Sequence, residues 1–291
     1  GCKRPMDAFI QAAHLMGWRT LNIDPQGDLA QWKAAFETAI RLHANGVATI
    51  GANTTVFKRQ LADLKKAGVV AINVSGAKAD GPPAWFANIY QHNYQQGILE
   101  AAFLTYKSGG KANILITDDS EYDSIQEWLA GFKAGLAKYC PACHISDTLD
   151  FTLADFQTTL PNEVKAALQA HPEINWIWGS YDAASVPVIQ AVQQLGLAHK
   201  IQLVSVNGDP QNVTYIANKQ VESGTVANSL EWEGWAAIDQ MNRAFNHVPA
   251  VADEHYGTKL LTINNLPHPT TIPWNGDINF RSHYMKIWKV K

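Results

Sequence analysis

The sequence predicts an α/β protein with two doubly wound parallel-sheet lobes. A short β-branched run, a turn and an amphipathic helix recur about every 25 to 30 residues, which is typical of parallel βαβ units. The segment from Val69 to Val74 is nearly all apolar, as expected for a strand buried on both faces. The chain has 291 residues, which corresponds to two domains of about 150 residues each.

The first predicted lobe opens with a helix instead of a strand. Its expected elements are a helix over Met6 to Met16, a strand over Trp18 to Asp24, a helix capped by Asp28, a strand over Val47 to Ile50, a helix over Phe57 to Ala67 and the strand from Val69 to Val74. In an open α/β sheet a leading helix normally follows a strand. We therefore expect a first strand and its loop upstream of Gly1. A sheet that begins at Trp18 and carries an accessory helix is the alternative.

The remainder of the chain repeats the same rhythm. Its expected helices cover Gln96 to Tyr106, Ser124 to Ala137, Leu160 to Ala170, Ala183 to Leu195, Gln211 to Asn218 and Trp232 to Asn246. Its expected strands cover Ala112 to Thr117, His144 to Leu149, Trp176 to Gly179, Ile201 to Val206, Ser223 to Ala227 and Lys259 to Ile263. The tail from Asn265 onward is rich in Pro and Asn, so we expect it to wrap the surface without a sheet of its own.

The composition excludes several classes of protein. With 46% hydrophobic residues the chain can fill two cores, yet it has no apolar run of about 18 residues. Lys and Arg number 23 against 26 Asp and Glu, so no basic surplus exists for a phosphate backbone and no nucleic acid partner is expected. Ten Trp, nine Tyr and ten Phe are more rings than packing alone usually requires, which suggests a ring-shaped or planar ligand.

Cys140 and Cys143 lie in a turn after a helical stretch. A redox pair would open a helix instead of following one, and no second Cys pair completes a zinc set. We expect a local disulfide, and reduced bystander thiols are the alternative. A disulfide favours an oxidising compartment such as the periplasm.

Signatures of catalysis and of cofactors are weak. No Gly-x-Gly-x-x-Gly follows a strand and no Gly-x-Ser-x-Gly occurs, so neither a dinucleotide nor a nucleophile elbow is predicted. The acidic run from Asp118 to Asp123 lacks the glycine and the ligand alternation of a calcium loop. The ten His residues show no i, i+4 pairing. We therefore predict no enzyme activity, no cofactor and no metal site.

An ordered series of short motifs resembles the periplasmic binding proteins of the ribose-binding type, from about Met6 to Asn264. The motifs are Asp28-Leu29-Ala30-Gln31, Gly46-Val47-Ala48-Thr49-Ile50, Ala67-Gly68-Val69-Val70, His92-Asn93-Tyr94-Gln95-Gln96-Gly97, Ala130-Gly131-Phe132, Gly179-Ser180-Tyr181-Asp182-Ala183-Ala184 and Ser205-Val206-Asn207-Gly208. The resemblance implies two lobes joined by three hinge crossovers, with a ligand cleft between them. It places residues 1–90 and 229–259 in the N-terminal lobe and residues 91–228 and 260–291 in the C-terminal lobe.

The resemblance also implies a set of ligand-binding residues near the strand ends. Asn73 and Asn207 stand where the family commonly has Asp, Asn228 where it has Gln, Trp128 where sugar binders often carry Arg, and Tyr181 where Asn is common, while Asp182 keeps the family's acid. Trp232, Tyr122 and Asp118 are further candidates.

Each candidate also has a structural interpretation. Asn73 and Asn207 could satisfy loop backbone groups, and Asp182 could cap the helix that follows it. Trp128 and Trp232 could pack in a core or a hinge. Tyr122 and Asp118 could lie on a solvated loop.

The chemistry of the candidates indicates a neutral ligand. An Asn amide both donates and accepts, which suits a hydroxyl group, and an indole face suits the C–H face of a sugar ring. The absence of Arg disfavours an anionic solute. The leading hypothesis is a monomeric periplasmic solute-binding protein that closes at its hinge on a neutral sugar or polyol and delivers it to the permease of an ABC importer.

Two other functions fit the same fold. One is a periplasmic sensor subunit that presents a small solute, for example a methylated amine, to a membrane receptor kinase, because aromatic rings can cage such a cation. The other is the effector domain of a LacI-type repressor, against which a disulfide would count.

Overall fold

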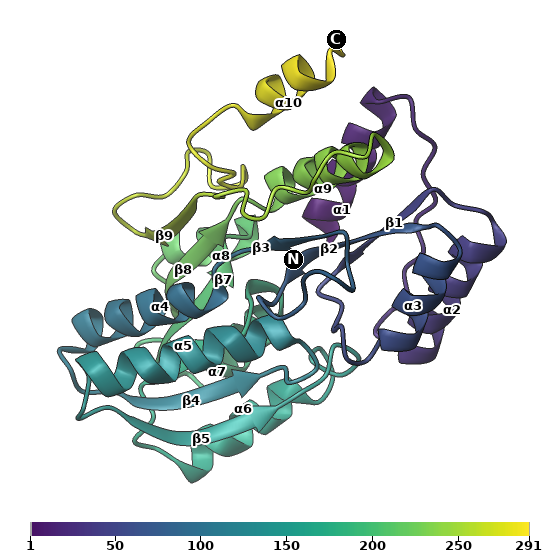
Figure 1. Cartoon of the computed structure of the whole chain (residues 1–291). Coiled ribbons are helices and arrows are strands. Elements are labelled where there is room, and N and C mark those ends of the chain that lie inside the picture. The colour runs from purple at the N-terminus through teal and green to yellow at the C-terminus, as the bar shows by residue number, and fades with distance from the viewer. Residues whose placement is uncertain (1, 291) are drawn as a thin grey trace.

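A computed structural model of the chain describes residues 2–290 and contains two α/β lobes, each built on its own sheet (Figure 1). The fold class predicted from the sequence is confirmed. Within the described residues, no helix combines the length and the apolar character that a membrane span requires.

The first lobe has a three-stranded parallel sheet in the order β1-β2-β3. Its strands are β1 (Gly46–Ile50), β2 (Val70–Gly76) and β3 (Ala87–Tyr90), and its helices are α1 (Lys3–Leu15), α2 (Leu29–Arg41), α3 (Lys58–Lys66), α9 (Leu230–Phe245) and α10 (Phe280–Trp288). Alternate residues of β2 face opposite ways. Ile72 and Val74 pack toward α1 and α9, whereas Ala71 packs with the residues of α2 and α3. The sheet therefore has a helical layer on each face.

The second lobe has a six-stranded sheet in the order β5-β4-β6-β7-β8-β9, in which only β9 is antiparallel. Its strands are β4 (Asn113–Asp118), β5 (His144–Asp150), β6 (Trp176–Gly179), β7 (Gln202–Asn207), β8 (Glu222–Asn228) and β9 (Thr258–Thr262). Its helices are α4 (Asn93–Ser108), α5 (Asp123–Tyr139), α6 (Leu160–Ala170), α7 (Asp182–Gln194) and α8 (Pro210–Ala217).

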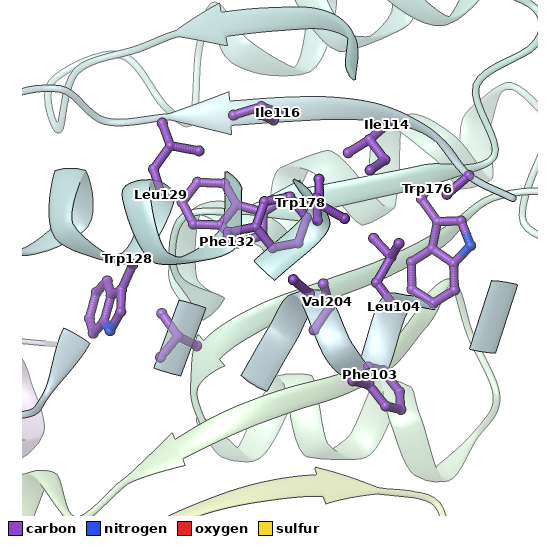
Figure 2. Close-up of a cluster of buried hydrophobic side chains, with 14 of the residues drawn as sticks. Phe103, Leu104, Ile114, Ile116, Trp128, Leu129, Phe132, Trp176, Trp178 and Val204 are labelled. Carbon is purple, nitrogen blue, oxygen red and sulfur yellow. The ribbon is translucent and has the colours of Figure 1, made fainter. Parts of the chain in front are cut away.

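Helices cover both faces of this second sheet. Trp176 and Trp178 of β6 pack against α4 and α5, while Ile177 between them packs against α6 and α7. Figure 2 shows the α4 and α5 side of this core, with Trp178 beside Phe132 and with Trp128 at the edge of the cluster. The position of Trp128 at that edge brings its ring to the region between the lobes.

Helices α4 and α5 approach each other closely through glycines. A Cβ atom on Gly97 would lie 2.0 Å from the Trp128 carbonyl oxygen, and one on Gly131 would lie 2.0 Å from the Tyr94 carbonyl oxygen. Both neighbours are backbone atoms, which cannot move aside without moving a helix. Glycine is therefore required at both positions for this helix pair to form, and Trp128 is held on a rigid support.

The predicted strand over Trp18 to Asp24 is wrong. These residues run as an irregular segment, because no strand among residues 2–290 lies beside them to accept and donate ladder hydrogen bonds. The segment and the free edge of β1 instead line a common cavity of about 1760 Å³, whose walls also include α1, α2 and the end of α9. The expected strand upstream of Gly1 stays a prediction.

Two elements were missed by sequence reasoning. The strand β3 follows Pro82-Pro83, whose turn character hid a short strand with alternating burial. Helix α10 lies in the Pro- and Asn-rich tail, and its residues Phe280, Tyr284 and Trp288 pack on Trp235 of α9. The end of the tail thus packs on the first lobe, which corrects the assignment of residues 280–288 to the C-terminal lobe.

Three crossovers connect the lobes: residues 91–92, residue 229 and residues 246–257.

Cys140, just after α5, forms the expected local disulfide with Cys143.

Candidate ligand-binding cleft

The large cavity continues between the two lobes, where the ends of parallel strands meet. Its walls there are made by Gly51 and Ser75 of the first lobe, by Tyr122, Ser124, Trp128, Tyr181 and Asn207 of the second, and by Gln91 of the first crossover. Four of these residues lie at or just after the carboxyl end of a strand: Gly51, Tyr122, Tyr181 and Asn207. Open α/β sheets bind their ligands at these ends.

The lobes touch each other across this cavity. A Cβ atom added to Gly51 would lie 3.1 Å from the Tyr122 ring, and one added to Gly27 would lie 3.5 Å from the Leu153 side chain. The backbone N–H of Lys78 donates to the Glu127 carboxylate at 2.9 Å. The two lobes are therefore in contact, and both contribute to the wall of this cavity.

Tyr181 is held in the second-lobe wall by a buried carboxyl. Its hydroxyl donates to Asp119 Oδ2 at 3.0 Å. Burial raises the pKa of Asp119 to about 7, although the Tyr181 hydroxyl bond lowers it. Burial and the nearby Asp119 carboxyl raise the pKa of Tyr181, so the phenol keeps its proton at neutral pH. The ring presents a neutral aromatic surface to the cavity.

Trp128 is connected to the hinge through Gln96. The Trp128 Nε1–H donates to Gln96 Oε1 at 3.1 Å, and Gln96 Nε2 donates to Asn228 Oδ1 at 2.9 Å and also to the Gln91 carbonyl. One amide thus joins the cleft ring to the first crossover and to the end of β8, directly before the second crossover. Gln91 Oε1 and Asn228 Nδ2 are buried, and neither has a partner within residues 2–290.

Behind the first-lobe wall lies the buried carboxyl of Glu233. Ser75 Oγ donates to Glu233 Oε2 at 2.6 Å, and Gln91 Nε2 donates to Oε1. Burial raises the pKa of Glu233 to about 7, against the effect of these two hydrogen bonds. Glu233 therefore fixes the side chains of Ser75 and Gln91, two residues that line the cavity.

Four of the predicted residues line the cavity: Tyr122, Trp128, Tyr181 and Asn207. The Asn207 carbonyl accepts from Arg4 Nη1 at 3.3 Å, while its side-chain amide has no hydrogen bond to another described residue. Asn207 therefore presents an unused donor and acceptor.

Asn73 does not line the cavity. It is fully buried, and its side chain accepts from Thr49 Oγ1 and the Ala52 N–H, both at 3.1 Å, and donates to the Ala52 carbonyl at 3.0 Å. Strand β2 continues to Gly76, two residues beyond the predicted end at Val74. The tip of the strand is therefore formed by Ser75, and Asn73 holds the loop after β1.

Four other predicted residues lie behind the cleft. Asp118 accepts from Gln126 Nε2 at 2.9 Å, Asn228 binds Gln96, and Trp232 stacks on Phe280 with ring centroids 5.6 Å apart. Asp182 does not cap α7, because its carboxylate accepts from Ser205, Thr225 and the Asp209 N–H instead. It is fully buried beneath the sheet ends and holds the loop that follows Asn207.

Sequence reasoning missed Ser75, Gln91, Gln96, Asp119 and Glu233. Gln96 and Glu233 lie on helices, and their roles depend on contacts with residues far away in the sequence. Ser75 could have been found by extending the strand from Val69 to Val74 by two residues.

The wall between the lobes is uncharged on its surface. Its polar groups are hydroxyls and amides, and the charged residues that line the cavity, Lys3, Arg19 and Asp24, belong to α1 and the segment after it. The nearby Arg4 is already engaged, because it donates to Asp209 Oδ1 at 3.1 Å and to Asn275 Oδ1 at 3.2 Å. The arrangement suits a ligand with hydroxyl groups and an apolar face.

Comparisons with known proteins identify the family and the fold of the chain. The family model of the periplasmic binding protein domain matches residues 3–247. No curated protein sequence matches the chain. Among solved structures, an ABC sugar transporter subunit from Rhodobacter sphaeroides is similar with a TM-score of 0.82 at 19% identity, over 90% of this chain and 93% of that chain.

Two other similar structures were solved with a ligand. A solute-binding protein of an ABC transporter from Bacillus halodurans, with bound myo-inositol, has a TM-score of 0.80 at 17% identity, over 90% of each chain. Another from Agrobacterium vitis, with bound allitol, has a TM-score of 0.80 at 18% identity, over 90% of each chain. At these identities the similarity shows the shared fold.

Proposed function

The chain belongs to the periplasmic binding protein domain family, and on that premise we propose that it binds a neutral sugar or polyol and delivers it to the permease of an ABC importer. The family binds solutes, so the chain is a binding protein and not an enzyme. The observation that carries the proposal is the uncharged wall of hydroxyls, amides and rings that both lobes build around one cavity.

The mechanism is closure at the hinge. A solute between Ser75 and Gln91 on one side and Tyr122, Tyr181 and Asn207 on the other touches both lobes only when they are closed. It therefore binds the closed form more tightly and shifts the population toward it. The protein acts as a monomer in the periplasm, where the Cys140–Cys143 disulfide is stable, and the permease binds the closed surface.

The ligands of similar proteins support the chemical class. The myo-inositol and allitol bound in two of them are both neutral and carry several hydroxyl groups. Such a solute needs groups that donate and accept hydrogen bonds. The Asn207 side chain has both capacities unused, and Gln91 has one unused acceptor, Oε1.

A thermal-shift screen tests the proposal. The full chain is heated with pentoses, hexoses, their polyols, inositols, sugar acids and methylated amines. A neutral polyhydroxyl solute should raise the melting temperature, because a ligand that binds only the folded state stabilises it by RT ln(1 + [L]/Kd). A rise with sugar acids alone, or with methylated amines alone, would contradict the proposed ligand class.

Calorimetry with the best solute then tests the site. Asn207→Ala should weaken binding by about tenfold or more, because it removes a hydrogen-bonding amide from a closed cleft. Asn264→Ala removes an amide from an exposed loop and should leave the affinity unchanged. Equal affinity in the two variants would place the solute elsewhere.

Deletion of the gene separates transport from sensing. An importer subunit is required for uptake of the solute that it binds, so the deletion strain should lose that uptake. A strain that keeps normal uptake but no longer responds to the solute would identify a sensor subunit.

A further inference from the structure

Two of the three crossovers bring imidazole and carboxylate groups together on the outside of the hinge. His92 ends the first crossover, directly before α4, and Asp253 and His255 lie in the third, between α9 and β9. His92 Nε2 lies 3.0 Å from Asp253 Oδ2, and His255 Nδ1 lies 3.5 Å from Asp253 Oδ1. None of these three residues takes part in the cleft.

We propose that His92, Asp253 and His255 bind a divalent transition-metal ion, with zinc as the best-suited ion. One ligand atom from each of the three residues lies within 4.8 Å of the others. Bonds of about 2.0–2.2 Å to a tetrahedral zinc ion place neighbouring ligand atoms roughly 3.3–3.5 Å apart. The separation between His255 Nδ1 and Asp253 Oδ1, 3.5 Å, matches this spacing, and His92 Nε2 lies closer, at 3.0 Å, to the other carboxylate oxygen. Side-chain rotations can therefore bring one atom of each residue around a single ion.

The donor set selects the class of ion. Two imidazole nitrogens and one carboxylate oxygen suit zinc and its neighbours in the transition series, whereas calcium and magnesium prefer oxygen ligands alone. His92 and Asp253 are half-buried and His255 is exposed. The fourth position is therefore open to water, as in an exchangeable site.

The position of the site gives the ion an effect on the hinge. An ion held by His92 on one crossover and by Asp253 and His255 on another ties the two segments together in the present geometry. The lobes touch each other in this geometry, so the ion should favour the closed form. This effect is separate from solute binding and can be measured without a solute.

Zinc titration of the untagged full chain tests the site. Cys2 is a free thiol and a possible competing ligand, so every protein carries Cys2→Ser. One equivalent of zinc should bind, and His92→Ala and His255→Ala should each weaken binding by at least about tenfold. The control His199→Ala removes an exposed imidazole far from the hinge and should leave zinc affinity unchanged.

Solution scattering of the solute-free protein provides the second measurement. Zinc should lower the radius of gyration of the parent protein and leave that of His255→Ala unchanged. His255 is exposed and forms no packing contact in the core, so its variant should fold and melt as the parent does without zinc. Failure to bind one equivalent, or equal zinc affinity in the double variant His92→Ala/His255→Ala, would overturn the proposal whatever the outcome of the solute screen.

Discussion

The two sheets of the molecule differ in how completely they are enclosed. The second-lobe sheet has six strands, its core strand β6 is buried at every residue, and helices cover both faces. The first-lobe sheet has three strands, and β1 at its edge is only partly buried because that edge lines the large cavity.

The two lobes therefore support their sides of the cleft in different ways. Tyr122, Trp128 and Tyr181 stand on a closely packed support, in which a side chain has little freedom to move. Ser75 belongs to β2 of the sheet with the open edge, and its side chain is held by a hydrogen bond to the Glu233 carboxylate. We infer that the second lobe provides the rigid template and that the first lobe adapts on closure.

Gly131→Ala should give the largest loss of stability. The added methyl group would meet the Tyr94 backbone at 2.0 Å, and neither helix of the pair can yield locally. We expect the free energy of unfolding to fall by about 3 kcal/mol or more. Denaturant unfolding followed by Trp fluorescence measures this change.

The matched control for this variant is Gly81→Ala. The nearest atom to its added methyl group is 3.9 Å away, so the expected change is within about 0.5 kcal/mol. A Gly131→Ala protein as stable as this control would show that α4 and α5 are not packed as described.

Substitution of two buried tryptophans, one in each lobe, should give a smaller difference in the free energy of unfolding. Trp178 Nε1–H donates to Glu100 Oε2 at 2.9 Å, and burial raises the pKa of Glu100 well above its ordinary value. Trp235 is equally buried, but its Nε1–H has no partner among the described residues. Trp178→Phe should therefore cost about 2 kcal/mol more than Trp235→Phe, because only the former leaves a buried carboxyl without a donor.

The two phenylalanine variants are compared in the same thermal unfolding experiment. Similar volumes are lost at the two sites, so the difference between the variants reports the hydrogen bond. An equal loss in both would mean that the Glu100 bond contributes nothing to stability.

Gly46→Ala in the first lobe should give the smallest loss of stability. Its added methyl group would approach Met241 Sδ at 2.7 Å, but this side chain is flexible and borders the cavity with Gly46. We expect a loss of about 1 kcal/mol or less. A loss as large as that of Gly131→Ala would show that the β1 edge is packed as tightly as the second lobe.

The sequence predicted the elements of the second lobe well and those of the first lobe less well. The ranges of α6 and β6 match the prediction to the residue, because periodicity and flanking turn residues mark both ends. The segment from Trp18 to Asp24 has a strand-like pattern, but a strand also needs a neighbour, and the pattern of one segment does not contain that neighbour.

The cleft could be predicted only where its residues follow strand ends. Asn207 and Tyr181 were found in this way, since β7 and β6 end next to them. Asn73 was chosen because the end of β2 was placed two residues too early. Gln96 and Glu233 lie on helices that pack against the hinge, and only the tertiary structure shows that they support the cleft.

Gln96 also makes the cleft and the hinge mechanically dependent on each other. Its amide oxygen accepts from the Trp128 indole, and its amide nitrogen donates to Gln91 on the first crossover and to Asn228, the last residue of β8 before the second crossover. A solute that displaces the indole ring would therefore also disturb the amide that binds these hinge residues.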